Sequence, residues 1–349
     1  MASDEHLKAN DPRIPLTGIT PEGHTPLVPK GSSQVQAEME AFAKQGRIQK
    51  HKTLKEYKKA ISKVKDDGAA VEYLQAERDK KLAEIKHEYL FDQANVYSEN
   101  SGTGTLPKDL SDKELNRIVV RAYLPQYSRG EELLSSIGHI AGAGLSLVML
   151  IVGVVFASLS KVPGSFPMAN RSLAITGMAI FGLGAVILYT ISATYHLLYV
   201  NRGKRVLRIL DHSSIYVLIA SSYTPICLTD FLTINGFPWG YVILGIEWGL
   251  GITLIVFNAL WLKNPVVKGI SIAGYIVLGW GIIFFVPQLI AGLGTIGFAL
   301  LMTGGILYTL GAILFGMGAK IHYVHGVAHI LYVIATILHF LSFLLYVIL

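Results

Sequence analysis

Residues 320–349 read KIHYVHGVAHILYVIATILHFLSFLLYVIL, and this stretch decides the fold. It is apolar to its end and exceeds the about 20 residues that a helix needs to cross a bilayer. His325 and His329 lie four residues apart, so a helix places both imidazoles on one face. Such a pair suits one metal ion, although paired helical histidines also occur as packed or hydrogen-bonded neighbours. The stretch predicts a membrane-spanning helix with a candidate metal site near its start.

The composition divides the chain into a polar and an apolar part. Hydrophobic residues make up 52% of the 349 and charged residues 15%, against about 25% charged in an average soluble domain. Residues 1–130 hold 21 of the 30 Lys and Arg and 19 of the 24 Asp and Glu. This polar part is nearly balanced in charge, so we expect no nucleic-acid partner. The sequence predicts an all-α membrane protein with a polar N-terminal extension.

The polar part divides further. Residues 1–33 contain five prolines and are predicted to be a disordered tail. Residues 34–128 are predicted to form a charged, helical, cytoplasmic extension. Within it, helical periodicity between residues 35 and 92 is broken at Asp66-Asp67-Gly68. We expect either a short helical hairpin or a coiled coil through which two chains self-associate.

Two weaker signals follow the predicted hairpin. Residues 93–110 are rich in Ser, Gly and Thr and are predicted to be a linker. Ser111 and Glu114 have the spacing of a capping box, in which each side chain bonds the other's backbone N–H at a helix start. The helix that they begin is expected to end before Pro125.

Residues 129–349 are predicted to form a seven-helix membrane domain. Seven apolar stretches are long enough to span a bilayer. They cover residues 133–159, 172–198, 209–229, 239–261, 267–287, 295–316 and 322–349.

The charges between these stretches predict their orientation. Lys and Arg are enriched in the second, fourth and sixth connections, and cytoplasmic loops carry such an excess. The N-terminus is therefore expected in the cytoplasm and the C-terminus outside, with the chain located in the plasma membrane.

This orientation brings polar residues of three spans to one depth near the cytoplasmic face. The second span ends with Ser192 and His196, the third begins near Asp211, and the last begins with His325 and His329. Ionisable residues inside a membrane are costly and usually mark a site. Three imidazoles and a water form the ligand set of a catalytic zinc centre. Asp211 is the candidate general base or orienting group, and Ser192 could bond the water or a substrate oxygen.

Four motifs carry a resemblance to a known family. They are EELLSSIGHIAGAG (131–144), SATYH (192–196), LDHSSIYVLIASSYTP (210–225) and HGVAHILYVIATILHF (325–340). In this order they resemble the haemolysin III family, the bacterial branch of the progestin and adipoQ receptor superfamily, which is distantly related to alkaline ceramidases. The resemblance implies seven helices, an inward N-terminus and one Zn²⁺ held by His196, His325 and His329, with Ser192 and Asp211 matching family positions.

Three functions are compatible with these residues. The first is a zinc-dependent hydrolase whose substrate is a membrane lipid amide or ester, as in ceramidases. The second is a pore or transport protein, for which Glu247 and Asn258 are the obvious extra lining residues. The third is a receptor-like sensor whose zinc is structural.

Further histidines need separate interpretation. His139 matches a family histidine and could support the metal ligands, or could make a hydrogen bond at the helix start. His322 is interpreted as a helix-end histidine rather than a ligand. His339 lies ten residues beyond His329, about 15 Å along a helix, so we expect it to bond another helix. His212 points about 100° away from Asp211 and is a poor ligand.

Overall fold

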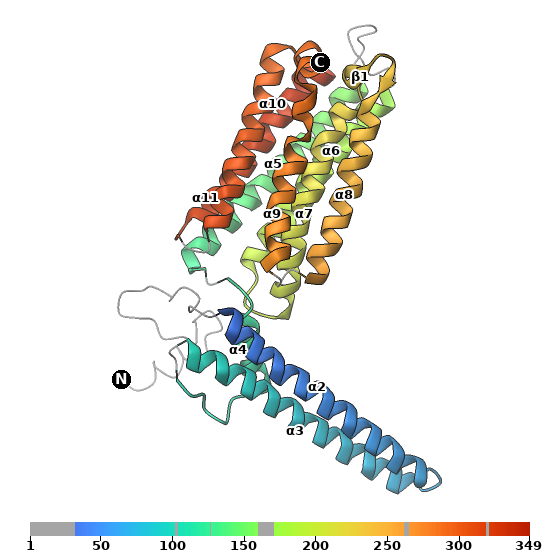
Figure 1. Ribbon diagram of the computed structural model, residues 1–349, viewed down its shortest axis with the longest axis vertical. Coiled ribbons are helices and arrows are strands. Elements are labelled where there is room, and N and C mark those ends of the chain that lie inside the picture. Colours follow the sequence, from blue (N-terminus) through green and yellow to red (C-terminus); the bar gives the residue numbers. More distant parts are fainter. Residues whose placement is uncertain (1–31, 102–103, 126, 160–170, 262–264, 319–320) are drawn as a thin grey trace. The chain divides into compact units, whose positions relative to one another are not determined.

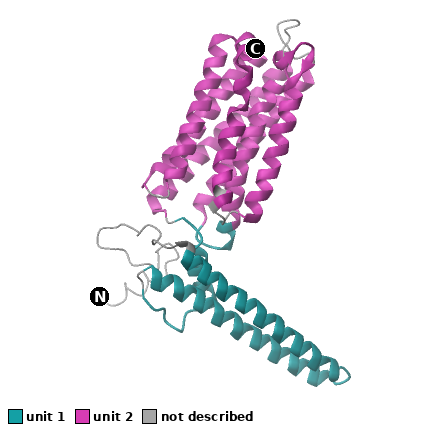
Figure 2. Cartoon of the chain, viewed as in Figure 1, with its two compact units in different colours: residues 1–126, 199–205 teal, residues 127–198, 206–349 magenta. Residues whose placement is uncertain are grey.

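The computed structural model describes residues 32–101, 104–125, 127–159, 171–261, 265–318 and 321–349, and most of them are helical (Figure 1). This confirms the all-α prediction. Two compact units are distinguished by their internal contacts (Figure 2). The first comprises residues 1–126 and 199–205, and the second comprises residues 127–198 and 206–349. Most of the predicted disordered tail lies outside the described residues, whereas Ser32 and Ser33 already belong to a helix.

The first unit is built on a long helical hairpin of α2 (Ser32–Lys63) and α3 (Gly68–Asn100). The predicted break lies between them, and the Asp67 carboxylate caps α3 by accepting a hydrogen bond from the Ala70 backbone N–H at 3.1 Å. Gly46 permits close packing of the two helices, because a Cβ there would lie 2.8 Å from Cγ of Tyr89. A helical hairpin, one of the two predicted forms, is therefore present within a single chain.

The predicted linker over residues 93–110 is wrong in its first part, because α3 continues to Asn100. Ala94 and Tyr97 are buried in a small core with Leu90 and Leu115, and this packing keeps the chain helical. The next helix, α4 (Asp112–Arg121), has the predicted capping box of Ser111 and Glu114 and ends before Pro125.

The second unit is a bundle of long helices. They are α5 (Arg129–Leu159), α6 (Arg171–Leu197), α7 (Arg202–Cys227), α8 (Trp239–Trp261), α9 (Pro265–Trp280), α10 (Val286–Met317) and α11 (Val324–Phe343). Within the described ranges, five stretches are long and apolar enough to cross a membrane: Arg129–Leu159, Arg171–Leu197, Trp239–Trp261, Gly269–Met317 and Val324–Ile348. Many of their apolar side chains face outward, as a lipid-facing surface requires. The protein is embedded in a membrane.

Five stretches rather than the predicted seven are found for two physical reasons. The predicted third span, residues 209–229, carries Asp211, His212 and several Ser and Thr side chains, which lower its hydropathy. Four cations precede it in α7. The stretch Gly269–Met317 contains two predicted spans, because the 3₁₀ segment η2 (Gly281–Phe285) joins α9 to α10 without a polar loop. The count of seven and the orientation remain predictions.

Three local irregularities interrupt the helices. Gly294 lies inside α10 with φ of 66°, which a residue without Cβ adopts freely. The last residues of the chain form a π-helical turn, η3 (Leu344–Ile348). Between α7 and α8, strands β1 (Thr233–Ile234) and β2 (Phe237–Pro238) form a small hairpin, with Asn235 and Gly236 both at positive φ.

Close packing of α6 against its neighbours fixes the helix that delivers His196. A Cβ on Gly177 would lie 3.0 Å from Cα of Pro225 in α7. On the α11 side, the Tyr189 hydroxyl donates to the Tyr332 carbonyl at 2.8 Å and lies 2.5 Å from the Thr336 hydroxyl. These buried contacts set the position of α6 relative to α7 and α11.

Candidate metal centre

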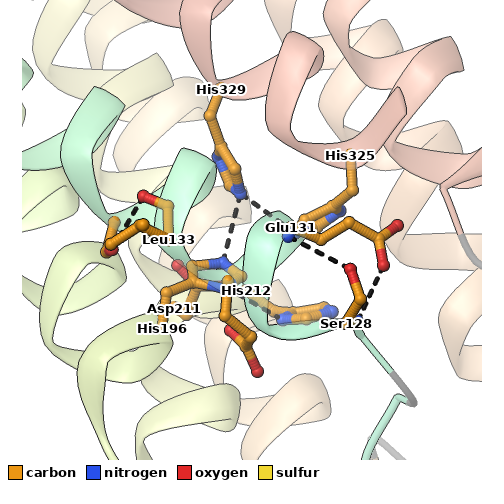
Figure 3. Close-up of polar contacts among 10 residues, drawn as sticks. Ser128, Glu131, Leu133, His196, Asp211, His212, His325 and His329 are labelled. Atoms are coloured by element: carbon orange, nitrogen blue, oxygen red, sulfur yellow. Dashed lines mark hydrogen bonds and ion pairs between the residues drawn. The ribbon is translucent and has the colours of Figure 1, made fainter. Parts of the chain in front are cut away.

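Three imidazoles converge at one end of the bundle (Figure 3). His196 comes from the last turn of α6, and His325 and His329 come from the first two turns of α11. Nε2 of His329 lies 2.9 Å from Nε2 of His325 and 3.2 Å from Nε2 of His196. All three residues are buried. The structure thus brings together the three residues that the sequence predicts as ligands.

The three nitrogens fit a metal ion of the kind that imidazoles bind. Zn–N bonds of 2.0–2.1 Å in tetrahedral geometry separate two ligand nitrogens by roughly 3.3 Å, close to the observed 2.9 and 3.2 Å. Nε2 of His329 faces two other ring nitrogens, and neutral imidazoles cannot all satisfy one another there, since each has one donor and one acceptor. A shared cation satisfies all three lone pairs at once.

Glu132 holds the first of these imidazoles. Its Oε2 lies 2.6 Å from Nδ1 of His196, whose side chain is fully buried while that of Glu132 is 21% exposed. When the carboxylate accepts a hydrogen bond from the Nδ1–H of His196, the Nε2 atom of that ring keeps its lone pair, which faces the other imidazoles. This role of Glu132 was not predicted from the sequence, although the adjacent acidic pair at the start of an apolar span was a visible signal.

Glu131 joins the start of α5 to the start of α11. Its carboxylate accepts hydrogen bonds from the backbone N–H of Ser128 at 2.7 Å and from that of Tyr323 at 2.8 Å. The Glu131 N–H in turn donates to Oγ of Ser128 at 3.2 Å, completing a capping box. Tyr323 has φ of 64°, and this left-handed residue directly precedes α11. The carboxylate therefore fixes the turn from which His325 and His329 begin.

Aromatic rings pack around the same imidazoles. Tyr127 stacks on His325 with ring centroids 4.7 Å apart and planes inclined by 22°. On the other side, His139 meets His329 edge to face, with centroids 3.9 Å apart. His139 is thus adjacent to the three imidazoles but does not belong to the group whose nitrogens converge. This position is compatible with its predicted supporting role.

A cavity of about 120 Å³ adjoins the imidazoles. At this end it is lined by His139, Ser192, Asp211 and His329. Asp211 is 4% exposed and Ser192 is fully buried, so both predicted catalytic groups lie in the membrane-embedded interior. The remaining wall, from α6, α7, α9, α10 and α11, is largely apolar and aromatic, and includes Ile215, Leu218, Ile219, Tyr275, Ile276, Trp280, Leu301, Ala312 and Phe315. It also contains a few polar side chains, among them Ser222, Thr309 and His339.

The other candidate residues lie apart from the three imidazoles. His322 Nδ1 is 3.4 Å from Glu131, as suits a helix-end histidine. His339 donates from Nε2 to the Leu301 carbonyl of α10 at 3.0 Å, which confirms the predicted bond to another helix. Nδ1 of His212 lies 2.9 Å from the Arg208 carbonyl of its own helix. None of these three side chains joins the convergent nitrogens.

Glu247 and Asn258 in α8 are both buried. Asn258 Oδ1 accepts a hydrogen bond from the Ser271 hydroxyl at 2.5 Å. Oε2 of Glu247 has no hydrogen-bond partner among the described residues. Neither residue is part of the cavity lining, so the two do not extend its polar end.

Comparison with known proteins agrees with this architecture. The family described as "Haemolysin-III related" matches residues 127–340. The Bacillus cereus protein named Hemolysin-3 is 34% identical over 180 residues, covering 52% of this chain and 75% of the relative. The Bacillus subtilis (strain 168) Hemolysin-3 homolog is 36% identical over 182 residues, covering 52% and 78%. The family match spans the helices that deliver all three imidazoles, and the chain belongs to the haemolysin III family.

Proposed function

We propose that the protein is a zinc-dependent hydrolase of a lipid amide or ester, embedded in the plasma membrane by seven helices with a cytoplasmic N-terminus. One observation carries the proposal: three convergent imidazoles lie beside a buried carboxylate and a hydroxyl at one end of a largely apolar cavity. His196, His325 and His329 would hold the ion. Zinc bound in this way supplies a Lewis acid that polarises a carbonyl and activates water.

The protein groups then have separate tasks. Asp211 accepts a proton from the water that attacks the carbonyl carbon and returns it to the amine or alcohol that leaves. Ser192 donates a hydrogen bond to the carbonyl oxygen and orients it. The apolar wall of α7, α9 and α10 accommodates the lipid chain and excludes bulk water. Glu132 holds His196 in the tautomer that a ligand requires.

The first experiment is the metal content per chain of detergent-purified protein, with His196→Ala and His325→Ala beside it. We expect about one zinc per chain, lost in both variants. Hydrolysis of a short-chain ceramide and of a fluorogenic acyl ester is then compared between wild type and Asp211→Asn. The variant should retain zinc and lose at least about 100-fold in rate. If the wild-type protein holds zinc but hydrolyses neither compound, the proposed hydrolase function is contradicted. A sensor with a structural zinc is then supported.

The names of the two relatives supply a second candidate, a pore or transport protein. A pore needs a continuous polar path. The cavity wall is mostly apolar, although Ser222, Thr309 and His339 also line it, and this favours the hydrolase. Release of a trapped dye or ion from liposomes separates the two functions. Flux that survives His196→Ala, without hydrolysis in wild type, would support a pore.

A further inference from the structure

One long face of α2 carries an unusual concentration of positive charge. Residues 44–63 contain eight Lys and Arg but one acid, Glu56. Seven of these cations are exposed, namely Lys44, Arg47, Lys52, Lys55, Lys58, Lys59 and Lys63. At 100° per residue the seven fall within about half of the helix circumference. We call these seven residues the basic face.

The basic face lies opposite the side of α2 that packs on α3. Met39 and Thr53 are buried on that packed side, and Gly46 lies against Tyr89 of α3. None of the seven basic-face residues forms an ion pair within the described part of the chain. The cations of α3 differ, since Lys81 pairs with Glu84 at 3.4 Å and Lys86 with Asp112 at 2.5 Å. The basic face is therefore available to an external anionic partner.

We propose that the basic face binds the anionic headgroups of a lipid bilayer. Charge complementarity is the first argument, because clustered Lys and Arg beside a membrane anchor are attracted to anionic lipids. The second is that Ile48 projects among the cations and Leu54 lies at the edge of the basic face, with exposures of 60% and 45%. Aliphatic side chains on a basic helical face suit the boundary between headgroups and acyl chains, whereas a phosphate backbone offers them no partner.

Tethering adds a third argument. The hairpin belongs to the same chain as the membrane-embedded unit. Its core includes α4, and only residues 122–128 separate α4 from α5. So short a connection keeps the basic face at high effective concentration near bilayer headgroups, so individually weak contacts suffice. Like charges also make the basic face unsuited to pairing with its own copy. Any self-association through these helices would use another surface.

The test uses full-length protein in nanodiscs, in a Cys227→Ala background with a donor fluorophore on Ser62→Cys, which lies among the basic-face residues. Energy transfer to an acceptor on lipid headgroups is compared between phosphatidylcholine discs and discs with one third phosphatidylglycerol. We expect transfer to rise roughly twofold in the anionic discs and to return to the neutral level at about 0.5 M salt. Equal transfer in both discs would overturn the proposal.

Two charge-reversed variants separate the basic face from net charge. Lys52→Glu/Lys55→Glu/Lys59→Glu should abolish the rise. Lys80→Glu/Lys81→Glu/Lys108→Glu makes the same change in net charge at exposed positions elsewhere and should preserve it. Equal loss in both variants would contradict a specific face. Displacement from anionic discs by a mixed-sequence oligonucleotide at comparable phosphate concentration would assign the face to nucleic acid instead.

Discussion

Glu132 Oε2 lies 2.6 Å from Nδ1 of His196, so the carboxylate at the start of α5 orients the imidazole at the end of α6. Replacing it by Glu132→Gln keeps the size of the side chain but removes the charge that favours an Nδ1–H donor. We expect zinc affinity to fall about 10- to 100-fold, as for other carboxylates that bond a ligand histidine. Competition with a chromophoric chelator measures it. Unchanged affinity would exclude a role for Glu132 in holding His196.

Glu131, one residue earlier, provides the matched comparison. Its carboxylate bonds the backbone of Ser128 and Tyr323 and lies outside the three imidazoles. Glu131→Gln should therefore lower thermal stability, by about 1 kcal/mol from the weakened cap, and change zinc affinity much less than Glu132→Gln. Thermal unfolding in detergent with and without added zinc distinguishes the two effects. An affinity loss equal to that of Glu132→Gln would show that the two glutamates act as one unit.

Gly304 of α10 allows close packing against the second half of α11. A Cβ there would overlap the ring of His339 and lie 3.1 Å from the Ala335 carbonyl, whereas a Cβ on Gly305 would meet nothing within 4 Å. We expect Gly304→Ala to destabilise the bundle by about 1–3 kcal/mol through overpacking. Gly305→Ala should leave stability unchanged or slightly raised. Apparent melting temperatures of the two purified variants give the comparison, and similar values would contradict this packing.

The three convergent histidines could be predicted because helical spacing and loop charge both restrict where a histidine lies in the bundle. The i, i+4 spacing placed His325 and His329 on one face of one helix. Loop charge then placed His196 at the same depth as that face. The metal itself, the hydrolytic chemistry and the roles of Ser192 and Asp211 rest on proposals, because residue positions alone do not specify which ion or substrate binds.

The role of Glu132 could not be derived from the sequence in the same way. Glu131 and Glu132 are adjacent, and one residue rotates a side chain by about 100° around the helix. Which of the two faces His196 therefore depends on the rotation of α5, and this is set by packing. In the structure Glu131 caps the helix and Glu132 reaches the imidazole.

Elsewhere, tertiary contacts outweighed local composition. The segment from Gln93 to Asn100 is helical because Ala94 and Tyr97 pack beside Leu115 of the next helix. The β1–β2 hairpin had a visible signal, because Asn-Gly at 235–236 favours a turn with both residues at positive φ. The hairpin was nevertheless not predicted, because the apolar spans on both sides of it pointed only to helices.

Asp112 predicts a pH effect in the extension. The hydrogen bond from Lys86, supported by that from His87, holds the pKa of Asp112 below its usual range. A carboxyl group with a lowered pKa stabilises the folded state above its unfolded pKa of about 3.9, and this contribution is lost as pH falls below it. Asp112 is partly exposed, so the contribution is only about 0.5 kcal/mol.

The corresponding variant is Asp112→Asn, and Asp109→Asn, at an exposed position, is its control. At neutral pH, α4 amides should exchange about twofold faster in Asp112→Asn than in wild type, and this difference should shrink near pH 3. Hydrogen–deuterium exchange corrected for intrinsic rates measures it. If the difference in exchange rate persists unchanged at pH 3, the effect does not come from the charge of the Asp112 carboxylate.

The cavity makes the last prediction. Ala312 lies in its lining, and a phenyl ring at this position would project into space that the proposed lipid chain occupies. Ala312→Phe should therefore reduce hydrolysis of a long-chain substrate at least about tenfold and leave zinc content unchanged, because the three imidazoles are not touched. Ile313→Phe is the control. Ile313 is 50% exposed on the outer surface, so a phenyl ring at this position adds its bulk outside the cavity. Rates are measured on long-chain and short-chain substrates together with metal content. Normal long-chain hydrolysis by Ala312→Phe would mean that the substrate does not occupy this cavity, whatever the role of the metal.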